Sequence, residues 1–280
     1  MRYLRFFLPL FLLAAAAAGC KSEYEILLEG NDIEAKYAAA FDYFNQGKYS
    51  RSSQLFESLS SQTGGLAIDD TVQYYWGLSN YRFKDYYTAE TNFTNFMMSY
   101  PKSPFVQDAT YFRIDCLYRQ TLRYELDQTP TKTAIQALTQ YMSDYPGSPY
   151  LQICGNMLQD LEDRLDKKAY ENARLYYKME DYQAASVALK NVLKDDSENI
   201  YREDILYHIA MSSYKYASMS VYNKQKERYM AFVDDYLNFV GEYPDSPYRK
   251  ELNSLYRKAQ KALGKAAVLV SDEDEEETEE

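Results

Sequence analysis

The chain has 280 residues, enough for one elongated helical domain or for two smaller ones. Ten glycines and eight prolines against 31 tyrosines and 46% apolar residues argue for folded helices and against disorder. The net charge of −11 argues against nucleic-acid binding, because phosphate recognition needs clustered Lys and Arg. Much of this charge is local, since residues 271–280 hold eight acids and no base.

Residues 1–19 are predicted to be a lipoprotein signal peptide. Arg2 and Arg5 flank the start of an apolar run that is too short for a comfortable membrane span. The run ends on Ala17-Ala18-Gly19-Cys20, which resembles the lipobox of bacterial lipoproteins. The resemblance implies a covalent lipid on Cys20, with palmitate or a similar acyl chain on its amine. The alternative is an ordinary secretory signal with a coincidental cysteine.

Residues 20–32 are predicted to be the lipidated cysteine and a tether. Lys21 follows the cysteine instead of Asp, which by the common sorting rule of lipoproteins implies the outer membrane. Fully extended, residues 21–32 would reach about 40 Å. Asn31 or Asp32 is suited to cap the first helix.

One pattern recurs five times after residue 33: a tyrosine, then Ala, Gly or Ile three residues later, then an aromatic residue after seven. The leading tyrosines lie 37 residues apart, except for one interval of 59, and such a period indicates a helical solenoid. Positions i, i+3 and i+7 share one helix face, and a small residue at i+3 lets a second helix approach closely. The five groups are Tyr37/Ala40/Phe44, Tyr74/Gly77/Tyr81, Tyr111/Ile114/Tyr118, Tyr170/Ala173/Tyr177 and Tyr207/Ala210/Tyr214.

The second half of each unit predicts another amphipathic helix, as in the spacing of Ala89, Phe93 and Phe96. Three units resemble the tetratricopeptide repeat (TPR) at six positions: Ala40, Gly47, Tyr49, Ser52, Phe56 and Gly64; Gly77, Lys84, Tyr86, Ala89, Phe93 and Pro101; Ala173, Glu180, Tyr182, Ala185, Leu189 and Ser197. The resemblance implies an all-α fold, a right-handed α-solenoid of about five TPR helix hairpins plus a C-terminal capping helix.

The predicted organisation follows from where the pattern is interrupted. Residues 33–150 hold units one to three, and the third contains a long internal loop from Thr121 to Lys132. Residues 151–264 hold a long connecting helix, units four and five, and a capping helix from Tyr248 to Leu263 that Gly264 ends. Residues 265–280 are predicted to be a disordered acidic tail, which either solvates the protein or docks on a basic partner.

No motif for catalysis or metal binding is present in the sequence. His208 is the only histidine, so it is predicted to be a packed or surface imidazole without a metal. Nucleophile-elbow, P-loop and zinc-protease motifs are all missing, and we expect no enzyme activity and no cofactor beyond the lipid on Cys20. Cys116 and Cys154 could pair if their Cα atoms lie within about 7 Å, or they are two buried free thiols.

Three repeat ends share one motif: Tyr100-Pro-Lys-Ser-Pro, Tyr145-Pro-Gly-Ser-Pro-Tyr and Tyr243-Pro-Asp-Ser-Pro-Tyr. With the lipobox and the long loop in unit three, residues 20–264 resemble the BamD family of outer-membrane assembly lipoproteins. The resemblance implies an anchored, periplasm-facing scaffold that binds the POTRA region of a BamA-like barrel protein, unfolded outer-membrane β-barrel clients and other assembly lipoproteins. It does not identify those clients or accessory lipoproteins. The alternative is a periplasmic TPR lipoprotein scaffold for cell-envelope or cell-division machinery.

The first helix of each TPR hairpin is expected to line a peptide groove. Aromatic rings with neighbouring positive charges suit a segment that ends in an aromatic residue and a carboxylate. The candidate residues are Tyr37, Phe44, Tyr74, Tyr81, Arg82, Tyr111, Tyr118 and Arg119. The alternative is that the rings pack repeat against repeat. Exposed rings would favour the groove and buried rings would favour packing.

Overall fold

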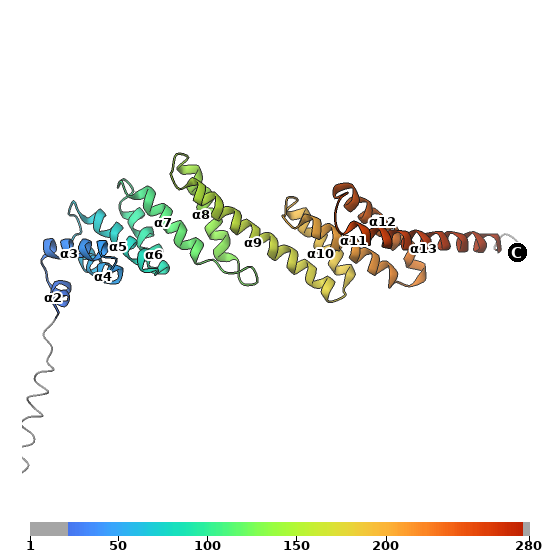
Figure 1. Cartoon of the computed structure of the whole chain (residues 1–280), viewed down its shortest axis with the longest axis horizontal. Helices are drawn as coiled ribbons and strands as arrows, with labels where there is room; N and C mark the ends of the chain where they lie inside the picture. The colour runs from blue at the N-terminus through green and yellow to red at the C-terminus, as the bar shows by residue number, and fades with distance from the viewer. Residues whose placement is uncertain (1–21, 277–280) are drawn as a thin grey trace, which may run out of the picture. The chain divides into compact units, whose positions relative to one another are not determined.

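The computed structural model describes the backbone of residues 22–276 and the side chains of residues 22–264. The predicted signal peptide and Cys20 lie outside these residues. The described part of the chain forms twelve α-helices and no strand, which confirms the all-α, TPR-like fold (Figure 1). It falls into two compact units: the first holds the residues up to Leu122 together with Thr129–Met157, and the second holds Arg123–Gln128 and the residues from Leu158 onward.

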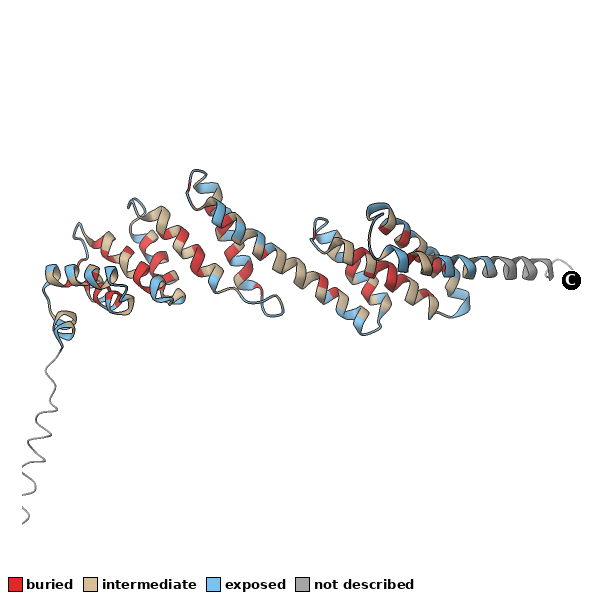
Figure 2. Cartoon of the chain, viewed as in Figure 1, coloured by how far each residue is buried: buried red, intermediate tan, exposed pale blue. Residues whose placement is uncertain are grey.

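The helices follow one another as antiparallel hairpins. The first unit contains α2 (Glu23–Glu29), α3 (Ile33–Asn45), α4 (Tyr49–Ser60), α5 (Asp69–Phe83), α6 (Tyr86–Ser99), α7 (Val106–Arg119) and α8 (Thr129–Asp144). Helix α9 (Leu151–Lys178) contributes to both units and confirms the predicted long helix. The second unit continues with α10 (Tyr182–Asp195), α11 (Arg202–Ser218), α12 (Tyr222–Glu242) and α13 (Arg249–Glu276). Figure 2 shows that within each unit the buried residues lie on helix faces turned toward neighbouring helices.

The hairpin turns form where the sequence predicts them. A residue with left-handed backbone ends the first helix: Gly47 at φ 73°, Lys84 at φ 69° and Glu180 at φ 62°. An aspartate then caps the second helix in two turns. Asp85 accepts a hydrogen bond from the Thr88 amide at 3.1 Å, and Asp181 does the same for α10. These caps satisfy amides that have no partner within the helix.

Four of the five leading tyrosines stack on the aromatic residue that begins the next unit. The ring pairs and centroid distances are Tyr74–Phe105 at 4.5 Å, Tyr111–Tyr150 at 3.8 Å, Tyr170–Tyr201 at 5.2 Å and Tyr207–Tyr248 at 4.1 Å. In three of the four pairs the second ring follows a Ser-Pro dipeptide. The leading tyrosine of the 37-residue period and the aromatic residue of the Ser-Pro-aromatic motif therefore supply the two rings of one packing contact.

The residue two positions before each of these second rings shapes the turn. Ser148 and Ser246 each accept a hydrogen bond from the amide two residues later, both at 3.1 Å. Ser103 makes the equivalent bond at 3.3 Å, and Asn199 takes over the role at 2.9 Å in the unit without the motif. Such short polar side chains stabilise turns by bonding the backbone two residues on. The motif therefore positions the ring and starts the next helix.

Small residues let the paired helices approach. A Cβ atom built on Gly77 would lie 2.9 Å from Cε1 of Phe93, which is closer than such atoms normally approach. Ala89 on the facing helix is fully buried, as are Phe93 and Phe96 beside it. The predicted register of the second hairpin is thus confirmed.

Ala89→Leu is expected to lower the free energy of unfolding by about 1–3 kcal/mol, since the larger side chain must overpack the α5–α6 contact. Urea denaturation of the wild type and the variant measures the change. An unaltered urea midpoint would mean that the α5–α6 contact at Ala89 can accommodate a larger side chain, which would contradict the close packing described here.

A tether is expected from the sequence over residues 20–32, but the described residues 22–32 do not form a free linker. They begin with α2, whose Ser22 and Glu25 form a reciprocal capping box. Lys36 is buried, and its ammonium donates to the backbone oxygens of Leu28 and Gly30 and to Ser58 Oγ at 2.7–3.1 Å. The capping box and this buried lysine explain why the segment packs as a helix.

The last helix also differs from the prediction. From the sequence we expect the helix to end at Gly264 and residues 265–280 to be disordered, whereas α13 continues to Glu276. A glycine inside a helix costs only about 1 kcal/mol relative to alanine, and the good helix formers Lys265, Ala266 and Ala267 follow it. Residues 277–280 lie outside the described part of the chain.

The cysteines and the histidine are buried. Cys116 and Cys154 are free thiols, which decides between the two alternatives for them, and burial raises the pKa of both. His208 packs edge-on against the rings of Tyr177 and Tyr207, and its Nδ1 donates to the Asp204 carbonyl at 2.8 Å. Burial lowers the pKa of His208, so it is the packed imidazole of the two predicted environments.

Candidate functional site

The eight predicted groove residues lie on α3, α5 and α7, the first helices of the three hairpins in the first unit. Two of them are not available to a ligand. Tyr74 is 4% exposed beneath Phe105, and Tyr111 is 8% exposed beneath Tyr150. The prediction that these two rings line a groove is therefore wrong. They pack one repeat against the next, because the aromatic residue that begins the following unit covers them.

The other four candidate rings are half-buried. Tyr37 contacts Phe41 at 4.9 Å between centroids, and Phe44 contacts Tyr75 at 5.3 Å. Tyr81 and Tyr118 lie at corresponding positions on α5 and α7. Half-buried rings can contribute to packing and still present an edge to a partner.

Tyr81 and Arg119 meet on one carboxylate. Asp115 is 1% exposed, and its Oδ2 accepts from Tyr81 Oη and from Arg119 Nε, both at 2.5 Å. The Arg119 guanidinium also lies 5.1 Å from the ring centroid of Tyr86. Burial and the bond to Asp115 raise the pKa of Tyr81, and the same carboxylate raises the pKa of Arg119. Arg119 is thus held in place and is not the free positive charge that the sequence analysis predicts.

Charge reversal should distinguish the two arginines of the candidate list. Arg119→Glu leaves the buried Asp115 carboxylate beside a second negative charge, and we expect a loss of about 1–3 kcal/mol in the free energy of unfolding. Arg82→Glu at an exposed site should stay within about 0.5 kcal/mol of the wild type. Thermal and urea melts of both variants check this. Equal stability of the two variants would contradict the role assigned to Asp115.

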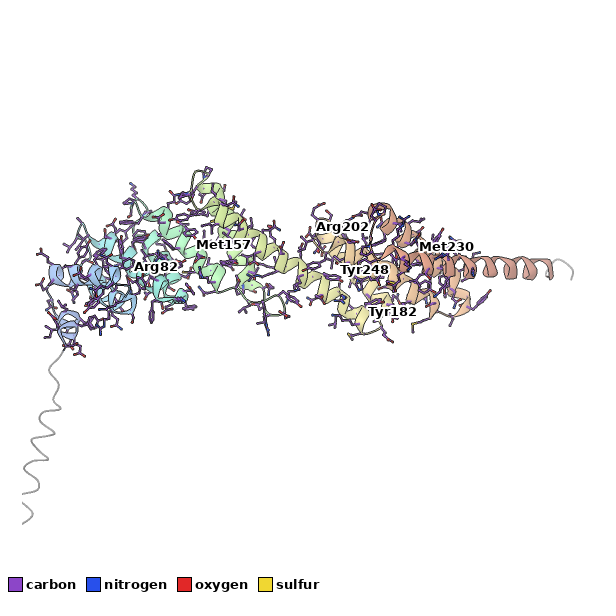
Figure 3. All side chains as sticks on the ribbon, viewed as in Figure 1. Arg82, Met157, Tyr182, Arg202, Met230 and Tyr248 are labelled. Atoms are coloured by element: carbon purple, nitrogen blue, oxygen red, sulfur yellow. The ribbon has the colours of Figure 1, made fainter. Side chains whose placement is uncertain are left out.

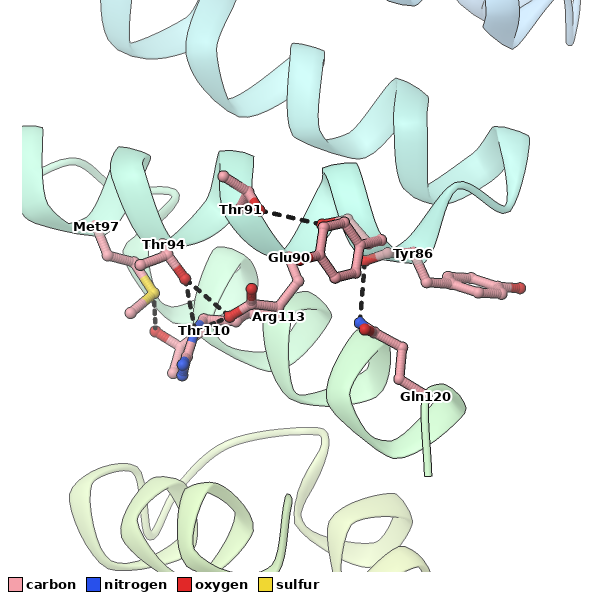
Figure 4. Close-up of polar contacts among 9 residues, drawn as sticks. Tyr86, Glu90, Thr91, Thr94, Met97, Thr110, Arg113 and Gln120 are labelled. Atoms are coloured by element: carbon pink, nitrogen blue, oxygen red, sulfur yellow. Dashed lines mark hydrogen bonds and ion pairs between the residues drawn. The ribbon is translucent and has the colours of Figure 1, made fainter. Parts of the chain in front are cut away.

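Polar contacts fix α7 against α6 beside this cluster (Figure 4). Arg113 Nε donates to Glu90 at 2.9 Å and to Thr94 Oγ1 at 2.8 Å. Gln120 at the end of α7 donates to the backbone oxygen of Tyr86 at 3.3 Å. The face that carries Tyr81, Asp115 and Arg119 is therefore held by several contacts between neighbouring repeats.

Arg82 lies at the end of α5, where Figure 3 labels it, with its guanidinium 6.0 Å from the Tyr81 ring centroid. It lines a cleft of about 460 Å³ whose walls are the α3–α4 turn and the α5–α6 turn. The lining residues are Gly47, Lys48, Tyr49, Ser50, Arg51, Arg82, Phe83 and Lys84. Sequence reasoning missed Lys48, Arg51 and Lys84 as site residues. The available signal was a basic residue at the turn of two successive units.

The second unit has its own cleft, of about 350 Å³, between α10, α11 and α12. Two of its lining lysines form ion pairs: Lys190 with Asp235 at 2.8 Å and Lys224 with Glu227 at 3.6 Å. The Arg228 guanidinium lies 3.9 Å from the Tyr216 ring centroid. Exposed apolar side chains, among them Val187, also line it. This cleft therefore combines exposed apolar side chains with ion-paired lysines.

Within the described residues, no helix is both long and apolar enough to cross a membrane. The same residues contain no group of three or more His, Cys, Asp or Glu side chains placed to hold a metal ion. The described residues therefore form a repeat scaffold with surface clefts and a row of half-buried rings.

A family model described as an outer membrane lipoprotein, YfiO, matches residues 30–229. The chain belongs to the YfiO family. The match runs from the end of α2 into α12, so both units carry the family pattern.

Two relatives of this chain carry the name outer membrane protein assembly factor BamD. The protein of Caulobacter vibrioides is 23% identical over 201 residues, which is 71% of this chain and 66% of the relative. The protein of Neisseria gonorrhoeae is 23% identical over 209 residues, which is 71% of this chain and 78% of the relative. The chain thus spans slightly less than two thirds of the Caulobacter protein. The resemblance to the BamD family is confirmed.

Among solved structures, the family member is similar to TPR proteins at 12% sequence identity. The TPR2AB domain of yeast Sti1 in complex with an Hsp90 peptide aligns with a TM-score of 0.40, covering 81% of this chain and 98% of that one. A tetratricopeptide repeat protein of Parabacteroides merdae aligns with a TM-score of 0.34, covering 89% of this chain and 80% of that one.

Proposed function

We propose that this protein is a non-enzymatic scaffold of outer-membrane β-barrel assembly. It is held by a lipid on Cys20 at the periplasmic face of the outer membrane, and it binds the POTRA region of a BamA-like barrel protein and unfolded barrel clients. The observation that carries the proposal is the YfiO family match over residues 30–229. The assembly-factor names of the two relatives support the same role.

The half-buried rings of the first unit support client binding. Tyr37, Phe44, Tyr81 and Tyr118 occupy repeated positions on the first helices of three consecutive hairpins. Rings at regular intervals suit an extended or helical segment with periodic apolar side chains. Rigid aromatic side chains also give contact area at low cost in conformational entropy. Tyr74 and Tyr111 are excluded from this role by burial.

The cleft of the second unit supports binding of the POTRA region. Two of its lysines, Lys190 and Lys224, form ion pairs, and Val187 and Ala231 on its wall are exposed. Exposed apolar groups next to satisfied polar groups are typical of protein contact surfaces. The first unit then remains free for clients, which is consistent with one scaffold holding two partners.

Controlled depletion of the protein from cells tests this function. We expect folded, heat-modifiable barrel proteins in the outer membrane to fall, and their unfolded forms to accumulate in the periplasm. Other outer-membrane lipoproteins serve as the control and should keep their level. Normal barrel content combined with a cell-division defect would support the alternative scaffold of envelope or division machinery instead.

A further inference from the structure

The cleft between the α3–α4 and α5–α6 turns carries concentrated positive charge. Four of its eight lining residues are basic, and none is acidic: Lys48, Arg51, Arg82 and Lys84. All four are exposed, and within residues 22–264 none of them forms an ion pair. This concentration contrasts with the net charge of −11 of the whole chain.

Aromatic rings lie next to Lys48 and Arg51 without neutralising them. The Arg51 guanidinium lies 5.1 Å from the ring centroid of Tyr24 and 5.6 Å from that of Tyr43. Lys48 Nζ lies 5.6 Å from the same Tyr43 ring. A cation over a ring keeps its full charge, so the positive potential of the cleft remains available to an anion. The carboxylate of Asp85, next in sequence to Lys84, accepts from the Thr88 amide.

The start of α4 adds to this potential. Helix α4 begins at Tyr49, and its N-cap residue Lys48 makes no side-chain cap bond. The first amides of a helix have no intrahelical acceptor and carry partial positive charge. Tyr49, Ser50 and Arg51 of this first turn all line the cleft. The chemistry fits phosphate or carboxylate groups.

The position of the cleft in the chain favours the membrane as the source of these anions. Tyr24 on α2 donates to Gln54 Oε1 at 2.6 Å and supports Arg51, so α2 is packed onto the cleft wall. Only three residues lie between Cys20 and Tyr24, so the Cα atoms of these two residues are at most about 14 Å apart. A lipid on Cys20 would therefore keep the Arg51 guanidinium within roughly 20 Å of the bilayer surface. Phe83, which is 54% exposed on the cleft wall, is the kind of side chain that enters the headgroup region.

We propose that this basic cleft docks on the phosphate headgroups of anionic phospholipids in the membrane that holds the anchor. The docking orients the first unit, because the cleft joins two successive hairpins through their turns. The proposal rests on the proposed lipid at Cys20 for its location. The test uses protein without that lipid. A failure of headgroup binding by the cleft can therefore be distinguished from a failure of the proposed lipid anchor.

The test uses the chain from residue 20 to 280, produced with Cys20→Ser and therefore without lipid. Co-sedimentation measures its partition onto vesicles of phosphatidylcholine with and without phosphatidylglycerol. The cleft variant is Lys48→Glu with Arg82→Glu. The matched control is Lys102→Glu with Lys132→Glu, two exposed lysines of the first unit outside the cleft, which change the net charge equally. The melting temperature of each variant confirms folding, and Lys48→Gln with Arg82→Gln replaces the cleft variant if charge reversal unfolds it.

We expect binding only to the anionic vesicles. The cleft variant should lose about tenfold or more in partition coefficient, while the control loses no more than about twofold. Equal losses in the two variants would overturn the proposal, as would equal binding to neutral vesicles. Binding of inorganic phosphate without binding to anionic vesicles would assign the cleft to a free anion instead. Binding of a peptide of residues 271–280 without binding to anionic vesicles would assign it to an acidic segment of this chain, and either result rejects the membrane.

Discussion

Tyr111→Ala is expected to lower the free energy of unfolding by about 3–5 kcal/mol. The ring is 8% exposed and stacks on Tyr150 at 3.8 Å, with planes 4° apart. Burial raises the pKa of Tyr111 to about 12, as befits a hydroxyl shielded from water. Removing the ring leaves a cavity between the third hairpin and the start of α9, and Tyr150 loses its partner.

The matched control is Tyr87→Ala, on α6 of the same unit, where the ring is 77% exposed. That variant should stay within about 0.5 kcal/mol of the wild type. Urea denaturation followed by circular dichroism measures both. If Tyr111→Ala were as mild as the control, the stacked pairs would not be the contacts that join the repeats.

Cys20→Ser is expected to abolish stable attachment to the outer membrane. The thiol is the proposed acceptor of the lipid, and several acyl chains give stable anchoring where one is marginal. The variant should be recovered in the soluble periplasmic fraction or as an uncleaved precursor. Fractionation with detection of both forms measures this, and metabolic labelling with palmitate provides the second readout. Unchanged outer-membrane fractionation of the variant would contradict the lipoprotein assignment.

The helix hairpins could be predicted because they rest on local rules. The spacing of Tyr74, Gly77 and Tyr81 places them on one helix face, and breakers such as Lys84-Asp85 mark the turn. The structure bears this out with a left-handed Lys84 and a capping Asp85. Such signals lie within a few residues of one another, so a single sequence is sufficient to read them.

The roles of the rings could not be predicted in the same way. A repeated tyrosine suits both a groove and a packing contact, and the deciding partners of Tyr74 and Tyr111 come from the next unit along the chain. Arg119 was misjudged for a related reason, since its partner Asp115 is buried by the fold. The capping box at Ser22 and Glu25, in contrast, is visible in the sequence as a signal for the start of α2, and the prediction of a tether overlooked it.

The basic cleft lies between these two cases. Lys48 and Lys84 are visible in the sequence as basic residues in successive hairpin turns. Their convergence with Arg51 and Arg82 on one cavity depends on how neighbouring hairpins stack. Basic residues at the same position of successive repeats therefore predict a shared binding cleft only when the stacking of the repeats is known.

The central claim is that the protein acts in outer-membrane barrel assembly through a POTRA-containing partner. Affinity purification of the tagged protein from detergent-solubilised outer membranes, followed by identification of the co-eluting proteins, tests it most directly. We expect a barrel protein with periplasmic POTRA domains to co-elute in near-stoichiometric amount. Purification of the intact, membrane-derived protein without any such barrel protein would contradict it.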